Sequence, residues 1–136
     1  MTKQTTAEGD EAEIRDLIVR WAKAVRDKDI DGILACHSSN ILMFDVPPPL
    51  ESRGIEAYGE TWDLFYTSQP VPIASDIQSM AVFAGADTAF VAALMQCAEI
   101  DKNGECTKLD FRLTVGLSKI DGRWMILHEH HSVPAT

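Results

Sequence analysis

A two-residue turn near the end of the chain constrains the fold more than any other sequence feature. Asp121 and Gly122 form a hairpin signal between two runs of alternating apolar and polar residues, 110–119 and 124–132. Counting outward from the turn places these side chains on one apolar face: Phe111, Leu113, Val115, Leu117, Ile126, His128 and His130. The opposite face would carry Asp110, Arg112, Thr114, Ser118, Glu129 and His131. A bulge within the hairpin would exchange the two faces beyond it.

Length and charge exclude several classes of protein. A chain of 136 residues corresponds to one domain with a sizeable core, which we expect over residues 10–136 after a flexible tail at 1–9. The net charge of −9 and the lack of a basic run argue against a nucleic-acid partner. The three cysteines show no C-x-x-C spacing, which fits reduced thiols and a cytoplasmic protein. No apolar run approaches the ~18 residues of a membrane span, and we expect no membrane partner.

The first half of the chain has helical periodicity. Asp10 followed by Glu13 predicts a helix start, and apolar residues then recur every three or four positions up to Val25. A short second helix is expected after Asp29. A third helix after Gly54 would place aromatic side chains on one face: Tyr58, Trp62, Phe65 and Tyr66.

Strands dominate the rest of the chain. A short strand over 40–46 must end near Asp45, because the prolines 47–49 cannot continue it. Four longer strands are predicted over 73–83, 88–100, 110–119 and 124–132, with turns at 85–87 and 101–104 between the first three. Three helices followed by an antiparallel meander predict an α+β fold, in which the helices pack on one face of a curved sheet.

Three segments carry a family resemblance. They are DIDGI at 29–33, the strand end Phe44-Asp45 with the following prolines and Arg53-Gly54, and DGRW at 121–124 with His130-x-Ser132-x-Pro134. Together they resemble the nuclear transport factor 2-like superfamily, and within it the SnoaL-like and ketosteroid-isomerase-like small proteins. The resemblance implies a conical barrel of strongly curved, mostly antiparallel sheet around the helices, with an internal apolar cavity, commonly in a homodimer. The superfamily includes isomerases, cyclases, dehydratases, hydrolases and non-catalytic binding modules, so the fold does not fix the reaction.

Asp45 is the first catalytic candidate. It ends an apolar strand and matches the position of the proton-shuttling aspartate of the isomerases that the chain resembles. In an apolar cavity its ionised form would lose hydration, which favours a general base at neutral pH. The alternative is that Asp45 caps the turn before the prolines.

The resemblance also implies donors for an enolate oxygen, and here the chain departs from the isomerases. Trp21 stands where those enzymes have a tyrosine on the first helix, and the late-strand aspartate falls near Thr114 or Asp110. Trp21 could equally be a core residue. We expect these side chains to bind substrate: Trp21, Trp62, Phe65, Tyr58, Phe111, Leu113 and Arg112. Arg112 would reach an anionic substrate only if a bulge turned it inward, and otherwise would pair with Glu129.

His128 and His130 complete the candidate set of catalytic residues. On the predicted inner face, either imidazole could exchange a proton near neutral pH and act with Asp45, although both could be hydrogen-bonded core histidines. His131 would face solvent or a partner chain, and His37 carries little signal. We expect no metal at these residues, because no dense cluster of ligands accompanies them.

The expected function is acid and base chemistry in a pocket. No phosphate-binding loop, nucleophile elbow or nicotinamide fingerprint occurs, so no organic cofactor is implied. The sequence therefore predicts a cofactor-independent isomerase, cyclase or dehydratase acting on an apolar carbonyl-containing ligand, in a homodimer. The alternative is a non-catalytic ligand-binding or dimerisation module of the same fold.

Overall fold

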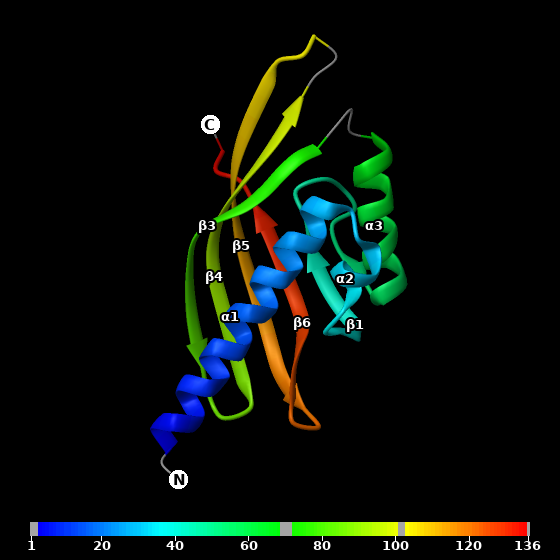
Figure 1. Cartoon of the computed structure of the whole chain (residues 1–136). Helices are drawn as coiled ribbons and strands as arrows, with labels where there is room; N and C mark the ends of the chain where they lie inside the picture. The colour runs from blue at the N-terminus through cyan, green and yellow to red at the C-terminus, as the bar shows by residue number, and fades with distance from the viewer. Residues whose placement is uncertain (1–2, 69–71, 101–102, 136) are drawn as a thin grey trace.

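Three helices and the strands of one sheet make up the computed structural model, which describes residues 3–68, 72–100 and 103–135 (Figure 1). The helices are α1 (Lys3–Asp27), α2 (Ile30–Leu34) and α3 (Ile55–Ser68). The strands are β1 (His37–Phe44), β2 (Ser52–Arg53), β3 (Pro72–Ala84), β4 (Thr88–Ile100), β5 (Cys106–Ile120) and β6 (Arg123–Ser132). The α+β fold predicted from the sequence is confirmed. The short β2 has no counterpart in the prediction, and the turn expected at 101–104 lies partly outside the described residues.

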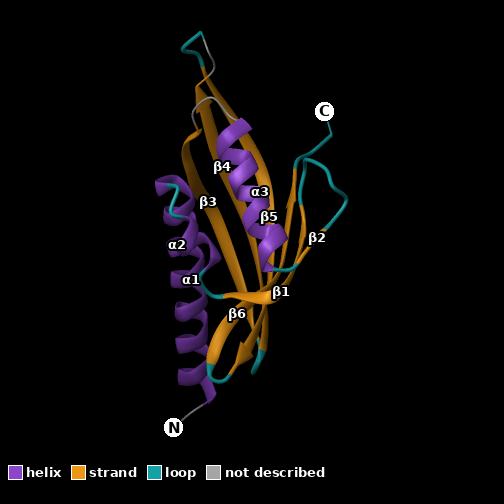
Figure 2. Cartoon of the chain, turned by 90° about the vertical axis from the view of Figure 1, so that its right-hand side faces the viewer, coloured by secondary structure: helices purple, strands orange, loops and turns teal. Residues whose placement is uncertain are grey.

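The sheet has the order β2-β1-β6-β5-β4-β3. β1 runs parallel to β6, and the other neighbouring strands are antiparallel. Register shifts interrupt the pairing of β3 with β4, of β5 with β6 and of β1 with β6. Such irregularities bend and twist a sheet, and the long strands curve visibly in Figure 2. The sheet does not close into a barrel, because β2 and β3 remain its edges.

The helices lie on the concave side of the sheet, where the core is (Figure 2). α1 crosses this side and packs against β3, while α3 packs against β1. α1 contributes buried side chains at the predicted spacing: Ile14, Leu17, Ile18, Trp21, Ala22 and Val25. They meet the inward side chains of the central strands, among them Leu113, Val115, Leu117 and Ile126. None of the helices, over the residues that are described, is long and apolar enough to cross a membrane.

The start of α1 differs from the prediction. The helix begins at Lys3 rather than at Asp10, and the flexibility expected for residues 1–9 stays a prediction. Asp10 therefore lies within α1 and does not cap it, and its carboxylate contacts residues far along the chain. Its Oδ1 accepts hydrogen bonds from Lys119 Nζ at 2.9 Å and from Trp124 Nε1 at 3.2 Å. The hydrogen bond from Lys119 is the main cause of the lowered pKa of Asp10.

The terminal hairpin is confirmed, but one register shift changes which side chains of β6 point into the protein. Asp121 and Gly122 both have positive φ angles, 52° and 78°, as the predicted two-residue turn requires. Leu117 pairs with Ile126, as the counting from the turn predicts. The register then shifts, since the next pair is Gly116 with His128, and Leu127 is left as an extra residue in β6. Beyond this bulge the inner and outer faces of β6 are exchanged.

Candidate functional site

The bulge places a different set of polar side chains inside the protein. Glu129 and His131, which the regular register put outside, are 1% and 8% exposed. His130 is exposed and His128 is half-buried on the other side of β6, so the predicted inward placement of these two histidines is wrong. Gly116 was a signal that could have revealed the shift, because a glycine within a strand often marks a bulge.

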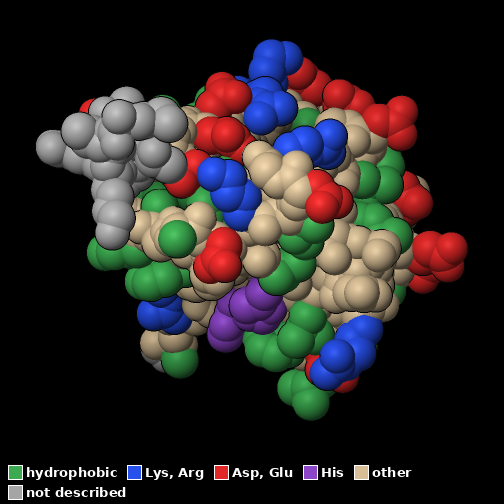
Figure 3. Space-filling view, turned by 90° about the horizontal axis from the view of Figure 1, so that it is seen from below, with side chains coloured by type: hydrophobic (Ala, Val, Ile, Leu, Met, Phe, Trp, Pro, Cys, Tyr) green, Lys and Arg blue, Asp and Glu red, His purple; other side chains and the backbone are tan. Residues whose placement is uncertain are grey.

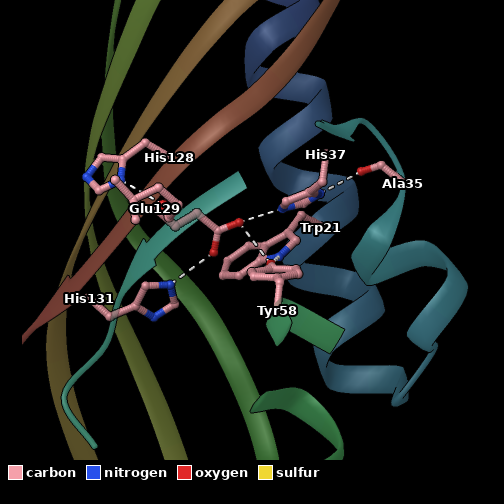
Figure 4. Close-up of polar contacts among 8 residues, drawn as sticks. Trp21, Ala35, His37, Tyr58, His128, Glu129 and His131 are labelled. Carbon is pink, nitrogen blue, oxygen red and sulfur yellow. Dashed lines mark hydrogen bonds and ion pairs between the residues drawn. The ribbon is translucent and has the colours of Figure 1, made fainter. Parts of the chain in front are cut away.

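Glu129 lies at the centre of a buried hydrogen-bond network (Figure 4). Its Oε2 accepts hydrogen bonds from the Tyr58 hydroxyl at 2.8 Å and from His37 Nε2 at 2.5 Å. Its Oε1 accepts one from His131 Nε2 at 3.1 Å. These side chains come from α3, the start of β1 and β6, so the network joins elements far apart in the sequence. Three donors on one carboxylate offset the cost of removing its charge from water.

The surroundings of Glu129 fix where the protons lie. His37 Nδ1 is 2.8 Å from the carbonyl oxygen of Ala35, which can only accept, so Nδ1 donates there and Nε2 donates to Glu129. Burial raises the pKa of Glu129, but the hydrogen bonds and charges of His131 and His37 outweigh it and lower that pKa from 4.5 to about 2. Glu129 is therefore a carboxylate at neutral pH, and the two acceptors that face His37 place a proton on each of its ring nitrogens.

The Glu129 carboxylate also stabilises the protonated form of His131. Burial lowers the pKa of His131, but the hydrogen bond and the charge of Glu129, with a smaller contribution from the charge of Asp45, raise it above 6.5. Since Nε2 donates to Glu129, protonation of the ring places the second proton on Nδ1. Nδ1 makes no hydrogen bond with another residue of the described ranges. In the protonated ring, Nδ1–H is therefore the donor that remains for a ligand.

Aromatic rings enclose the network. Trp21 Nε1 donates to the Tyr58 hydroxyl at 3.0 Å, and the His37 ring stacks on Tyr58 with centroids 4.7 Å apart. Burial, followed by the charge of Glu129, raises the pKa of Tyr58 well above 10, so its hydroxyl remains a donor. His131 stacks on Phe111 with a 10° angle between the ring planes. The orientation of each polar group is therefore fixed by packing as well as by hydrogen bonds.

A pocket of about 550 Å³ opens beside His131. Its apolar walls come from α1, α3, the proline loop and the outer ends of β4 and β5, and include Val25, Pro47, Trp62, Phe65, Leu109 and Phe111. Its charged or polar lining comprises Arg26, Asp45, Glu51, Ser52, Arg53, Glu60, Thr61 and His131. The pocket is therefore mainly apolar, and its titratable groups come from α1, α3, the segment 45–53 and β6.

Asp45 and His131 reach this pocket from adjacent strands. Met43 and Phe44 of β1 pair with Glu129 and His130 of β6, so Asp45 continues the strand alongside His131. Asp45 is half-buried, and its Oδ1 accepts a hydrogen bond from the backbone N–H of Val46 at 2.8 Å. This bond fits the turn-capping alternative, but it occupies only one lone pair and leaves the carboxylate able to accept a proton.

The other predicted site residues divide into two groups. Trp62, Phe65 and Phe111 line the pocket, as expected. Four others do not line it: Trp21, Tyr58, Leu113 and Arg112. The first three are buried in the core, and Arg112 is exposed on the outer face, where its Nε donates to Ser132 Oγ at 3.1 Å instead of pairing with Glu129.

His128 and His130 flank Phe44 on the outer side of the sheet. Both rings meet Phe44 edge-on, and His128 Nδ1 donates to the Leu42 carbonyl oxygen at 2.7 Å. Figure 4 shows His128 pointing away from the Glu129 carboxylate. Across the described ranges, no group of three or more His, Cys, Asp or Glu side chains is arranged to hold a metal ion.

The comparisons with known proteins agree on one family. The SnoaL-like domain family model matches residues 14–136. A crystal structure of an NTF2-like protein of unknown function from Pseudomonas putida KT2440 is 35% identical, with a TM-score of 0.85 over 95% of this chain and 89% of that one. No curated protein matches the sequence.

More distant structures share the fold alone. An NTF2-like superfamily protein from Salmonella enterica is 18% identical, with a TM-score of 0.79 over 93% of this chain and 92% of that one. The association domain of CaMKII from C. elegans is 20% identical, with a TM-score of 0.73 over 94% and 98% of the two chains. From the family match over most of its length, the chain belongs to the SnoaL-like domain family, within the NTF2-like fold.

Proposed function

We propose that the protein is a cofactor-independent acid/base enzyme that acts on an apolar carbonyl-containing ligand in the pocket beside β6. The observation that supports it best is the presence of a carboxylate, Asp45, and an imidazole whose pKa is raised, His131, in the lining of one mainly apolar pocket. Carbonyl enolisation needs such a pair, with a base for the carbon-bound proton and a donor for the oxygen.

The reaction follows from the positions of the protons. Asp45 takes a proton from the carbon next to the carbonyl group, and the electron pair of the broken C–H bond moves to the carbonyl oxygen. His131 Nδ1–H donates a hydrogen bond to that oxygen, and its positive charge stabilises the enolate. Asp45 then returns the proton to the same or a conjugated carbon, which completes an isomerisation. If the β-carbon of the ligand carries a hydroxyl group, the enolate can expel that group as water, with the proton that Asp45 has taken, and the reaction is then a dehydration.

His131 takes the oxygen-binding role in place of Trp21, which stands at the position of the isomerases' tyrosine, and in place of Tyr58, which was expected to bind substrate. Trp21 Nε1 is engaged with the Tyr58 hydroxyl, and that hydroxyl is engaged with Glu129. Neither group lines the pocket. We therefore assign the oxygen-binding role to His131 and no catalytic role to His128 or His130, which lie on the other side of the strand.

A homodimer is the second part of the proposal. Large apolar side chains lie exposed on the outer side of β3 and β4, where Phe83, Phe90 and Leu94 are 52%, 49% and 54% exposed. The Phe83 and Phe90 rings stack at 4.5 Å, which forms a flat apolar surface. Figure 3 shows hydrophobic side chains reaching the surface between charged ones, with histidines beside them. Exposed apolar surfaces of this kind often mark protein–protein contacts, and similar folds include an association domain, which supports self-association.

A ligand screen with three variants tests the proposal. Cyclic enones and 1,3-diketones would be screened by thermal shift and by turnover with the parent, Asp45→Asn, His131→Gln and His130→Gln. We expect a compound that raises the Tm of the parent to still bind Asp45→Asn but to lose turnover by at least about 100-fold. His130→Gln is the matched control, one residue from His131 but on the outer face, and should keep full turnover.

Two outcomes would contradict the proposed enzymatic function and favour a non-catalytic binding module. One is turnover by Asp45→Asn at the parent rate. The other is a ligand that binds the parent tightly and stays chemically unchanged. Sedimentation of the parent as a monomer at micromolar concentration would contradict the homodimer.

A further inference from the structure

The buried carboxylate of Glu129 binds two histidines, of which the proposed reaction uses only one. It binds His131, which reaches the pocket, but also His37, whose side chain is fully buried and does not line the pocket. Figure 4 shows the Glu129 carboxylate lying between the two rings, with Tyr58 and Trp21 on one side. A second imidazolium on the far side of the carboxylate therefore needs its own explanation.

Structural stabilisation alone does not explain the arrangement well. Buried ion pairs are costly to desolvate, and apolar residues of similar volume often stabilise a core as much or more. The surroundings of Glu129 are apolar and aromatic, so an apolar replacement would have partners ready for it. The charges are better explained by an effect on the one member of the network that contacts the pocket.

The charges of Glu129 and His37 have opposite effects on the pKa of His131. Glu129 favours the protonated ring, because its Oε1 accepts from Nε2 at 3.1 Å. His37 hydrogen-bonds the other oxygen of the same carboxylate, and its positive charge partly cancels the negative charge that His131 experiences. The pair thus sets how strongly His131 holds its second proton.

We propose that Glu129 and His37 are positioning residues that set the protonation of His131. Glu129 fixes the ring so that Nδ1 faces the pocket with a proton, and His37 limits how tightly that proton is held. The pKa of His131 is thereby raised by Glu129 and held back by His37. The inference rests on the proposed function, since it gives His131 the role of hydrogen-bond donor to the ligand oxygen.

Other charged groups face His131 as well. Asp45, after the end of β1, contributes to the raised pKa of His131, and Tyr58 stays neutral. The remaining titratable groups of the pocket lining are Arg26, Glu51, Arg53, Glu60 and Cys97. Because these groups are unchanged in variants of Glu129 and His37, they do not affect the comparison.

The test is a pH titration of the His131 ring by long-range 1H–15N NMR, on the full chain and without ligand. It compares the parent with Glu129→Gln, His37→Gln and the control His130→Gln. We expect the His131 midpoint to fall by about one pH unit or more in Glu129→Gln, a tenfold or larger loss of proton affinity. In His37→Gln the amide can still donate to Glu129 but carries no charge, so the midpoint should rise. His130→Gln should leave it unchanged.

The opposite shifts expected for the His131 midpoint in Glu129→Gln and His37→Gln distinguish positioning roles from a general loosening of the core. If both variants move His131 in the same direction, or if neither moves it, the inference is wrong. If Glu129→Gln does not fold, His37→Gln decides alone, since only an upward shift supports the account. The titration needs no substrate, so a failed ligand screen with the expected shifts would reject the proposed reaction and keep the positioning roles.

Discussion

Replacing Tyr58 with phenylalanine removes a single oxygen atom from the middle of the buried network. The Tyr58 side chain is fully buried, and its hydroxyl donates to Glu129 Oε2 at 2.8 Å and accepts from Trp21 Nε1 at 3.0 Å. Tyr58→Phe keeps the ring and its stacking on His37. Any change in stability therefore reports the hydrogen bonds rather than a large cavity.

The expected loss of stability follows from the two bonds. A hydrogen bond to a charged group contributes about 1.5–3 kcal/mol, and a buried donor left without a partner costs about 1–3 kcal/mol. Because the two effects overlap, we expect Tyr58→Phe to lower the free energy of unfolding by about 3 kcal/mol, a large part of the total for a domain of this size. The matched control is Tyr66→Phe, which removes a half-buried hydroxyl that donates to the Val25 carbonyl oxygen at 2.7 Å.

Urea unfolding at pH 7, followed by tryptophan fluorescence and by circular dichroism, measures both variants. Tyr66→Phe should lose about 1 kcal/mol, as is typical of one neutral hydrogen bond. A loss in Tyr58→Phe no greater than that in Tyr66→Phe would refute the reasoning, because it would mean that Glu129 does not depend on the hydroxyl.

Four further substitutions test other parts of the structure. The pKa of Glu129 is lowered from 4.5 to about 2 on folding, so its contribution to stability is present above pH 4.5 and is lost as the pH falls toward 2. The free energy of unfolding, measured by urea titration at pH 3 and at pH 7, should therefore change less with pH in Glu129→Gln than in the parent. Asp10→Ala removes the carboxylate that accepts from Lys119 at 2.9 Å, and should lower the unfolding free energy by about 2 kcal/mol, with an unchanged Tm as the contrary result. Gly122→Ala should lower the free energy of unfolding by about 1 kcal/mol, because φ at this position is 78°. Gly59→Ala within α3 should raise it by roughly 0.5–1 kcal/mol, because an added Cβ would meet no atom closer than 3.7 Å; thermal unfolding measures both variants.

Local sequence patterns predicted the elements well, because each rests on a short-range rule. The positive φ angles at Asp121 and Gly122 are the backbone form of the hairpin signal, and Asp29 accepts from the Gly32 N–H at 3.1 Å as a helix cap should. The periodicity of α1 likewise placed its buried side chains correctly. Asp10 misled the prediction because it lies within α1, where its carboxylate accepts from Lys119 and Trp124 instead of capping the start of the helix.

The site could not be predicted in the same way, because it depends on one extra residue. The bulge at Leu127 moved Glu129 and His131 inside and His128 outside. Strand alternation has no means of locating a bulge, although Gly116 marks its position. His37 lay beyond any local rule, since its partner is distant in the sequence and only the β1–β6 pairing brings them together.

The central claim is that Asp45 and His131 act on one ligand in one pocket. Incorporation of solvent deuterium next to the carbonyl group of a bound ketone, followed by 1H NMR in D2O, tests it most directly. The account predicts exchange with the parent, a loss of at least about 100-fold in Asp45→Asn, and parent-like exchange in His130→Gln. Exchange at the same rate in Asp45→Asn as in the parent would contradict the account.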